Sequence, residues 1–332
     1  MKKRKHLILF AISLLVFTGC SNQSKQEMSL SGLDEVEREE INYMIPYNMV
    51  SDGKEIYILQ TEFIYRIDME NCEIVLNCNR PLCKHRDTTC SAFMGYDFAS
   101  LSREGNQVYY LGNSIYKIEK NGKKEVGHGK YGAGTGNILF GDNIAFFKDN
   151  GTVVVESIST GKEMNSFNNV KPASQGNFYY DESLYIIDEN LALLRLDLNS
   201  GEQEVIEESG TTRASIYHNK IYYVLVNAEN GHNKLICYET KNGTKKEILE
   251  NVFYYNMKNE DIYYLSYPDY RFYHAKSDGS DLKEINISNV NASDLFIFPE
   301  QDKFIIGTFD NKMYIYDSQK EKLDLENPLS IP

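Results

Sequence analysis

The segment NCNRPLCKHRDTTCSAF, residues 77 to 93, contains three cysteines and one histidine in a chain that has six of each. Cys78, Cys83, His85 and Cys90 have the spacing C-x4-C-x-H-x4-C. Zn²⁺ prefers four soft or borderline donors in a tetrahedron, and three thiolates with one imidazole meet that preference without another residue. The spacing therefore predicts one zinc ion. Because protein donors would fill all four positions, we expect the zinc to be structural.

Disulfide bonds are a competing interpretation of these cysteines, and an extracytoplasmic location would favour them. With Cys20 modified as described below, five cysteines remain, and an odd number cannot pair completely within one chain. Cys72 could bridge to one of the three clustered cysteines and leave the other two to pair. Cys237, in the apolar stretch LICYET, suits a small buried residue. Zinc, disulfides and free thiols stay open, and we expect Cys72 and Cys237 to lie outside a zinc cluster.

The N-terminus, MKKRKHLILFAISLLVFTGC, has basic residues, then a short apolar stretch, then small residues before Cys20. This pattern is typical of a secretory leader and is too short for an ordinary membrane span. The residues before the cysteine resemble the bacterial lipobox, in which the cysteine is lipidated and the leader, residues 1–19, is removed. We therefore expect a lipid anchor on Cys20 and a location on the extracytoplasmic face of the cell membrane. An unmodified secreted protein is the alternative.

Residues 20–40 are polar and predict a flexible tether to the folded part. The formal net charge is −13, and it becomes −17 when the four basic residues of the leader are removed. An acidic protein is a poor match for polyanions, so we expect no nucleic-acid partner. We expect the protein to be a monomer.

A polar turn followed by an apolar or aromatic strand recurs along the chain, for example as SDGKEIYIL, HNKIYYV and NEDIYYL. The first apolar residue of each repeat serves as its anchor: Ile56, Val108, Ile144, Leu184, Ile221, Ile262 and Phe304. The anchors are spaced by 36 to 42 residues, except for a first interval of 52 that contains the cysteine segment. This spacing is typical of one blade of a four-stranded propeller.

Each repeat continues with a second strand and a turn, as in LALLRLDLNSGEQEVI, and Asn-Gly, Ser-Gly and Asp-Gly pairs in several of these turns supply the positive φ that tight hairpins need. A further candidate strand precedes the anchor, as in NVFYYNM. The sequence therefore predicts an all-β fold, a β-propeller with seven four-stranded blades over residues 41–332, with six or eight blades as alternatives. The Cys/His-rich insert occupies about residues 77–93. We expect INYMIPYNM to form the inner strand of the first blade, which meets the last blade.

The motifs DGKEIY, FIYRID and DGSDLKEI resemble those of β-propellers of the low-density-lipoprotein-receptor and TolB-like kind, over nearly the whole mature chain. Among bacterial extracytoplasmic lipoproteins there is an uncharacterised set of propellers in which a cysteine-rich insert ends the first blade. The segment CNRPLCKHRDTTCSAF resembles that insert. The resemblance implies a binding or scaffolding role and supplies no catalytic residues.

Three functions are compatible with these features. The leading interpretation is a membrane-anchored extracytoplasmic propeller that binds a protein or glycan partner on the face carrying the insert, without catalysis. The second is a glycan-processing enzyme with acidic residues at the mouth of the propeller channel, although no pair of acids can be singled out among 48. The third is a structural component of a cell-envelope assembly.

Overall fold

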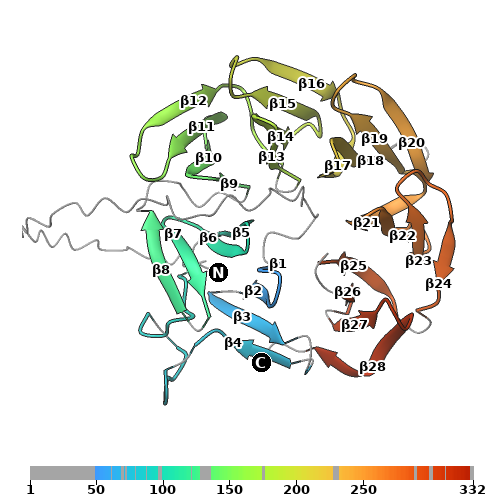
Figure 1. Cartoon of the computed structure of the whole chain (residues 1–332), viewed down its shortest axis with the longest axis horizontal. Helices are drawn as coiled ribbons and strands as arrows, with labels where there is room; N and C mark the ends of the chain where they lie inside the picture. The colour runs from blue at the N-terminus through green and yellow to red at the C-terminus, as the bar shows by residue number, and fades with distance from the viewer. Residues whose placement is uncertain are drawn as a thin grey trace, which may run out of the picture.

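The chain is a ring of seven antiparallel β-sheets. The computed structural model describes residues 49–329 except 61, 69–70, 72, 79, 87, 96–98, 121, 128–135, 174–175, 227–231, 288–289, 299–301 and 311. Within these residues there are seven four-stranded sheets and no helix, and Figure 1 shows the sheets arranged as blades around a centre. The predicted seven-bladed propeller is confirmed. No helix that could span a membrane occurs in the part of the chain that the structure describes.

The four strands of every blade follow one another in chain order from the centre outward. The inner strands are β1 (Met49–Ser51), β5 (Ser100–Glu104), β9 (Ile138–Phe140), β13 (Phe178–Tyr180), β17 (Thr211–Tyr217), β21 (Val252–Lys258) and β25 (Ala292–Phe296). The second strands are β2 (Ile56–Gln60), β6 (Gln107–Leu111), β10 (Asn143–Lys148), β14 (Ser183–Ile187), β18 (Lys220–Leu225), β22 (Asp261–Ser266) and β26 (Lys303–Thr308). The third strands are β3 (Phe63–Asp68), β7 (Ile115–Glu119), β11 (Thr152–Ser157), β15 (Leu193–Asp197), β19 (Lys234–Glu239), β23 (Phe272–Lys276) and β27 (Met313–Asp317). The outer strands are β4 (Glu73–Leu76), β8 (Gly122–Gly127), β12 (Glu163–Phe167), β16 (Gln203–Glu207), β20 (Lys245–Glu250), β24 (Lys283–Ile285) and β28 (Lys322–Leu329).

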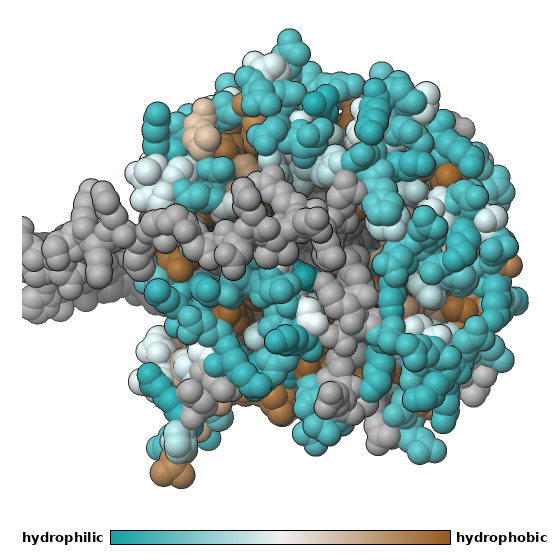
Figure 2. All heavy atoms as spheres, in the orientation of Figure 1, coloured by the Kyte–Doolittle hydropathy of each residue, from teal (hydrophilic) through white to brown (hydrophobic). Residues whose placement is uncertain are grey.

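The seven anchors predicted from the repeats all lie in second strands, and each is at most 1% exposed. A second strand is covered on both faces because each blade packs against two neighbours, so its apolar residues form the core between blades. The surface differs from this core. Figure 2 shows that one face of the molecule is mostly hydrophilic, with small hydrophobic groups scattered over it.

Packing between the first and last blades closes the ring. Met49, Ile56 and Ile58 of blade 1 share one buried cluster with Phe298 and Leu329 of the last blade. In the described residues, every sheet takes its four strands from one continuous stretch of chain, so no strand is exchanged between these blades. The predicted meeting of first and last blades is confirmed. The strand β1 begins at the end of the stretch INYMIPYNM, and residues 41–48 lie outside the described residues.

Antiparallel strands in this order give the propeller two distinct faces. One face carries the turns between second and third strands together with the connections from each outer strand to the next inner strand. We call it the connector face. The turns between inner and second strands and between third and outer strands lie on the opposite face.

Candidate metal centre

The Cys/His insert is the connection between the outer strand β4 of blade 1 and the inner strand β5 of blade 2, and Figure 1 shows it projecting beyond the outer edge of the ring. It is the connection that lengthens the first interval between anchors. Its tip extends away from the ring, and Leu82 there is 99% exposed. The insert therefore gives the junction of blades 1 and 2 a projecting shape.

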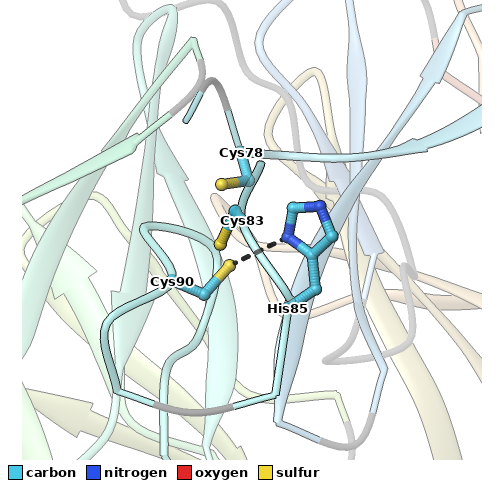
Figure 3. Close-up of side chains that lie close together, drawn as sticks. All are labelled: Cys78, Cys83, His85 and Cys90. Atoms are coloured by element: carbon cyan, nitrogen blue, oxygen red, sulfur yellow. Dashed lines mark hydrogen bonds between the residues drawn. The ribbon is translucent and has the colours of Figure 1, made fainter. Parts of the chain in front are cut away.

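The four predicted ligands converge. One donor atom from each of Cys78, Cys83, His85 and Cys90 lies within 4.8 Å of the other three, and Figure 3 shows the side chains pointing toward a common centre. His85 Nδ1 lies 3.4 Å from Cys90 Sγ. A tetrahedron with Zn–S bonds of about 2.3 Å has edges of about 3.8 Å, so the cluster is slightly wider than a zinc-bound one. A small contraction of the loop would bring the donors to bonding distance.

All three cysteines of the cluster are free thiols in the structure, as is Cys237. Cys90 is buried, Cys78 and Cys83 are partly buried, and His85 is exposed. Cys237 lies in β19 of blade 5, in a buried cluster with Tyr222, and is outside the metal cluster as predicted. Cys72 and Cys20 lie outside the described residues.

Hydrogen-bond donors around Cys78 stabilise its thiolate form. Burial raises the pKa of the Cys78 thiol, but the Ser91 hydroxyl and the backbone amides of Arg80 and Ser91 outweigh burial and lower the pKa to about 6. Burial raises the pKa of Cys90 to about 11, and the neighbouring Cys78 and Cys83 add to the rise. Three adjacent sulfurs cannot all become thiolates without a compensating cation, and a divalent metal is such a cation.

The loop that carries the ligands has an unusual backbone. Leu82 and His85 flank Cys83 and Lys84 with φ values of 60° and 50°. A residue with a side chain in this left-handed region costs about 1–2 kcal/mol, so it persists where surrounding contacts hold it. The two turns bring the side chains of Cys83 and His85 to the same side of the loop as Cys78 and Cys90, which is the arrangement shown in Figure 3.

The base of the insert is paired with blade 1. The amide of Met94 donates to the carbonyl of Glu62 at 2.7 Å, and the amide of Ile64 donates to the carbonyl of Ala92 at 3.0 Å. Phe63 and Phe93 form a bridge between these bonds, and their rings meet edge to face at 5.4 Å. These apolar residues pack with the cluster cysteines into one small core. The insert thereby continues the sheet of blade 1 beside β3.

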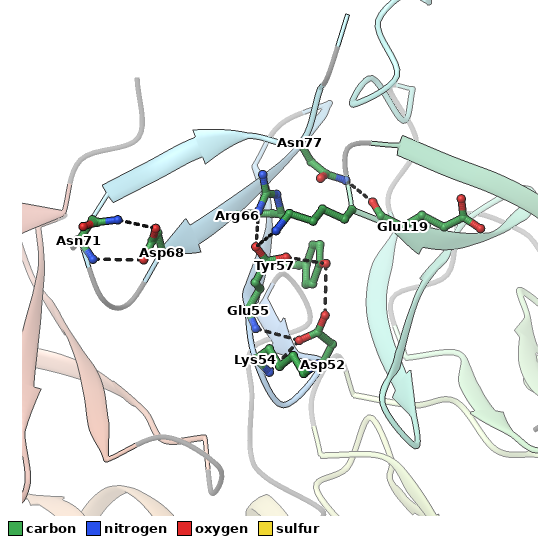
Figure 4. A network of polar contacts seen from close by, with 10 residues as sticks. Asp52, Lys54, Glu55, Tyr57, Arg66, Asp68, Asn71, Asn77 and Glu119 are labelled. Atoms are coloured by element: carbon green, nitrogen blue, oxygen red, sulfur yellow. Dashed lines mark hydrogen bonds and ion pairs between the residues drawn. The ribbon is translucent and has the colours of Figure 1, made fainter. Parts of the chain in front are cut away.

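A second set of contacts ties the insert to blade 2. Asn77 is buried, and its side-chain amide donates to the carbonyls of Glu119 at 3.1 Å and Gly122 at 3.3 Å in the β7–β8 hairpin (Figure 4). Lys123 of β8 donates to the carbonyl of Phe93. The base of the insert therefore bridges blades 1 and 2. The four clustered residues lie between Asn77 and Phe93 in the sequence, the two residues of the insert that form this bridge.

The sequence predicted the four residues that converge in the structure, but it did not predict the residues that hold them in place. Ser91 and Arg80 act on Cys78 through short-range hydrogen bonds, and Asn77 and Lys123 act through contacts across two blades. Asn77 stands directly before the first cysteine, but an asparagine there is as compatible with an exposed turn as with a buried contact. Only its position against the β7–β8 hairpin distinguishes the two.

No model of a known protein family matches the chain, and a comparison with curated proteins found no significant match. Solved structures do resemble it. The computationally designed protein Ika8 matches with a TM-score of 0.57 and 12% identity, covering 86% of this chain and 87% of Ika8. The β-propeller domain of Cps50 (Swd1) from Myceliophteria thermophila matches with a TM-score of 0.51 and 11% identity, covering 70% and 86%. BamB from Moraxella catarrhalis matches with a TM-score of 0.50 and 13% identity, covering 80% and 82%.

At such low identity these similarities establish the fold alone. A designed protein is among the neighbours, and so is dipeptidyl peptidase 4 from Porphyromonas gingivalis, of which this chain covers 52% with a TM-score of 0.51. The propeller fold hosts unrelated functions, so the function of this chain has to be argued from its own side chains.

Proposed function

We propose that Cys78, Cys83, His85 and Cys90 bind one zinc ion that clamps the insert onto the propeller. The convergence of four suitable donors within 4.8 Å supports this proposal. Three thiolates and one imidazole form a common set for structural zinc, and no position is left for water or substrate. The insert has little apolar content beyond its small core with Phe63 and Leu76, so a metal supplies the stability that this core lacks.

The clamped insert, in this proposal, is a binding element of a non-catalytic propeller. A rigid projection on one face, with the exposed Leu82 at its tip, suits recognition of a protein or glycan partner because preorganisation lowers the entropy lost on binding. The zinc thus contributes to binding through the shape of the insert. The single observation that carries the proposal is the convergence of Cys78, Cys83, His85 and Cys90 on the insert that follows blade 1.

We further propose that the mature protein is attached through a lipid on Cys20 to the extracytoplasmic face of the cell membrane, with residues 20–40 as its tether. The support is the basic and apolar leader with small residues before Cys20, all of it outside the described residues. A tether of this kind would let the propeller reach partners near the membrane.

An enzymatic role, the alternative predicted from the acidic composition, requires a carboxyl group whose pKa is raised so that it can donate a proton. In the described part of the chain, the carboxyl groups with a clearly shifted pKa are lowered, mostly by hydrogen bonds within hairpin turns: Asp197, Asp261, Asp278, Asp310 and Asp317. These groups therefore suit turn formation, and our proposal does not include catalysis.

The test of the proposal uses tagged, full-length protein in its own cells. Partners are crosslinked and identified for the wild type, for His85→Ala, which removes a ligand, and for Lys84→Ala, which changes the neighbouring exposed side chain. Purified wild type should contain about one zinc per chain, and His85→Ala should contain less and capture less partner. Lys84→Ala should match the wild type in both measurements. Full partner capture by metal-free protein would contradict the proposed role of the zinc.

A further inference from the structure

Three adjacent inner strands carry a β-bulge at the same level. The pairing of inner with second strand shifts between Thr212 and Ser215 in blade 5, around Phe253 in blade 6 and around Ser293 in blade 7. The corresponding pairs of the other four blades keep their register over the described residues. Bulges redirect side chains and are frequent beside functional sites. The three bulged strands β17, β21 and β25 lie side by side in Figure 1.

The bulges lie near the starts of their strands, which is the connector face, and they direct a cation and aromatic rings there. Arg213, in the blade 5 bulge, has a left-handed φ of 54°. Its guanidinium carbon lies 4.0 Å from the ring centre of Tyr254 and 5.5 Å from that of Phe253, the bulged residue of blade 6. The arginine is therefore held against two rings of the neighbouring blade.

Further aromatic residues extend this group over the turns of blades 6 and 7. The ring of Tyr270, in the β22–β23 turn, meets those of Phe253 at 5.0 Å, Tyr267 at 6.2 Å and Phe309 at 5.0 Å. Phe309, which follows β26, is 50% exposed, and Tyr267 is 37% exposed. We call Arg213, Phe253, Tyr267, Tyr270 and Phe309 the aromatic–arginine site.

Arg213 differs from the other cations near the site in its ion pairs. Arg271 pairs with Asp269 at 2.9 Å and with Glu284, and Lys312 pairs with Asp310 at 2.7 Å. No such ion pair involves Arg213 among the residues that the structure describes. A guanidinium has five N–H donors in a planar fork, so one that lies on aromatic rings can still bind a carboxylate through its edge.

We propose that the aromatic–arginine site binds a segment of a partner protein in which a carboxylate side chain stands beside a large apolar one. The inference rests on the proposed partner-binding function and names the chemistry of that partner. Arg213 receives the carboxylate in a charge-assisted pair, and the apolar side chain inserts between Phe309 and the tyrosines. Exposed tyrosine and phenylalanine beside a partly buried arginine form the composition of a protein-binding hot spot.

The geometry of the rings favours a peptide over a glycan. The ring of Tyr270 stands at 84° to Phe253, at 87° to Tyr267 and at 79° to Phe309. Perpendicular rings form corners that accept a protruding side chain, whereas the flat face of a sugar needs an open and parallel ring face.

The test begins with the mature, zinc-loaded protein and a displayed library of random linear peptides. We expect enrichment of sequences with Asp or Glu beside a large apolar residue. Synthetic labelled versions of the enriched peptides are then measured by fluorescence anisotropy. Arg213→Gln and Phe309→Ala should each weaken binding by about tenfold or more, and Arg213→Lys should weaken it less than Arg213→Gln. Met164→Ala and Val205→Ala are matched controls, since both side chains are 56% exposed in other blades, and should leave binding unchanged.

Several outcomes would overturn the inference. They are the absence of an enriched acidic and apolar motif, equal affinity of Arg213→Gln and wild type, and a preference for acidic glycans on a glycan array. Binding that appears only after deletion of residues 21–47 would assign the site to the chain's own acidic segment instead. If crosslinking still captures a partner that Arg213→Gln binds normally, the proposed function stands and only this inference fails. Thermal melting of each variant verifies that the propeller is folded.

Discussion

The contact of Asn77 with blade 2 allows a quantitative test of how the insert is held. The substitution Asn77→Ala removes two hydrogen bonds from a buried amide to the carbonyls of Glu119 and Gly122. Each such bond contributes about 1 kcal/mol net, so we expect a loss of about 2 kcal/mol in the free energy of unfolding. Hydrogen exchange should accelerate most in the β7–β8 hairpin and at the base of the insert, because these are the segments that Asn77 connects.

Asn77→Asp provides a sharper comparison because it keeps the shape and removes the donors. A buried carboxylate facing two carbonyl oxygens is repelled by them, so this variant should be less stable than Asn77→Ala at pH 7. Its carboxyl pKa should be higher in the folded than in the unfolded state. The penalty should therefore shrink as the pH falls toward 5 and the carboxyl becomes protonated.

The assay is urea unfolding followed by far-UV circular dichroism, since the chain has no tryptophan. Asn71→Ala is the control, because Asn71 is exposed and its bonds within the described part of the chain are to Asp68 in its own hairpin. That variant should differ from the wild type by less than about 0.5 kcal/mol. If Asn77→Asp were as stable as the wild type at pH 7, or if Asn71→Ala cost as much as Asn77→Ala, the proposed bridge between the blades would be wrong.

Three further outcomes are expected. Chelation of zinc should expose the insert to limited proteolysis between Cys78 and Cys90 while the far-UV spectrum of the propeller is retained; loss of the whole spectrum would show that the metal supports more than the insert. Phe298→Ala, at the junction of the first and last blades, should cost about 3–5 kcal/mol and increase hydrogen exchange in both blades, whereas an effect confined to the last blade would contradict closure by packing. Asp261 pairs with His274 and Lys276 at 2.8 Å, and these bonds lower its pKa although burial raises it. Asp261→Asn should therefore destabilise the protein at neutral pH. The difference from the wild type should shrink as the pH falls below 3.8, because the wild-type carboxylate then becomes protonated and loses the pair. An equal difference at every pH would refute this.

The candidate site could be predicted in part because its ligands are local. The four candidate ligands lie within a span of thirteen residues, from Cys78 to Cys90, so their donor chemistry and spacing can be read from the sequence without knowledge of the fold. Their donor atoms come within 4.8 Å of one another because the backbone turns at Leu82 and His85. Residues in left-handed conformations other than glycine leave no clear signal in a sequence.

The sequence by itself determined the architecture of this protein. Seven similar repeats, each with an apolar anchor such as Ile221 and a polar hairpin turn, specify seven similar sheets, because period-two alternation and tight turns act within a few residues. Neighbouring sheets with two apolar faces must then pack against each other, and a ring is the arrangement that buries them all.

The tertiary structure alone decided what the blades bring together. The contact of Asn77 with Gly122 spans two blades, and the aromatic–arginine site joins Arg213, Phe253 and Phe309 from three. These residues are 40 to 96 positions apart, and each by itself is an ordinary strand or turn residue. Register shifts in β17 and β21 bring Arg213 and Phe253 together, and such shifts depend on the packing of whole blades rather than on any local pattern.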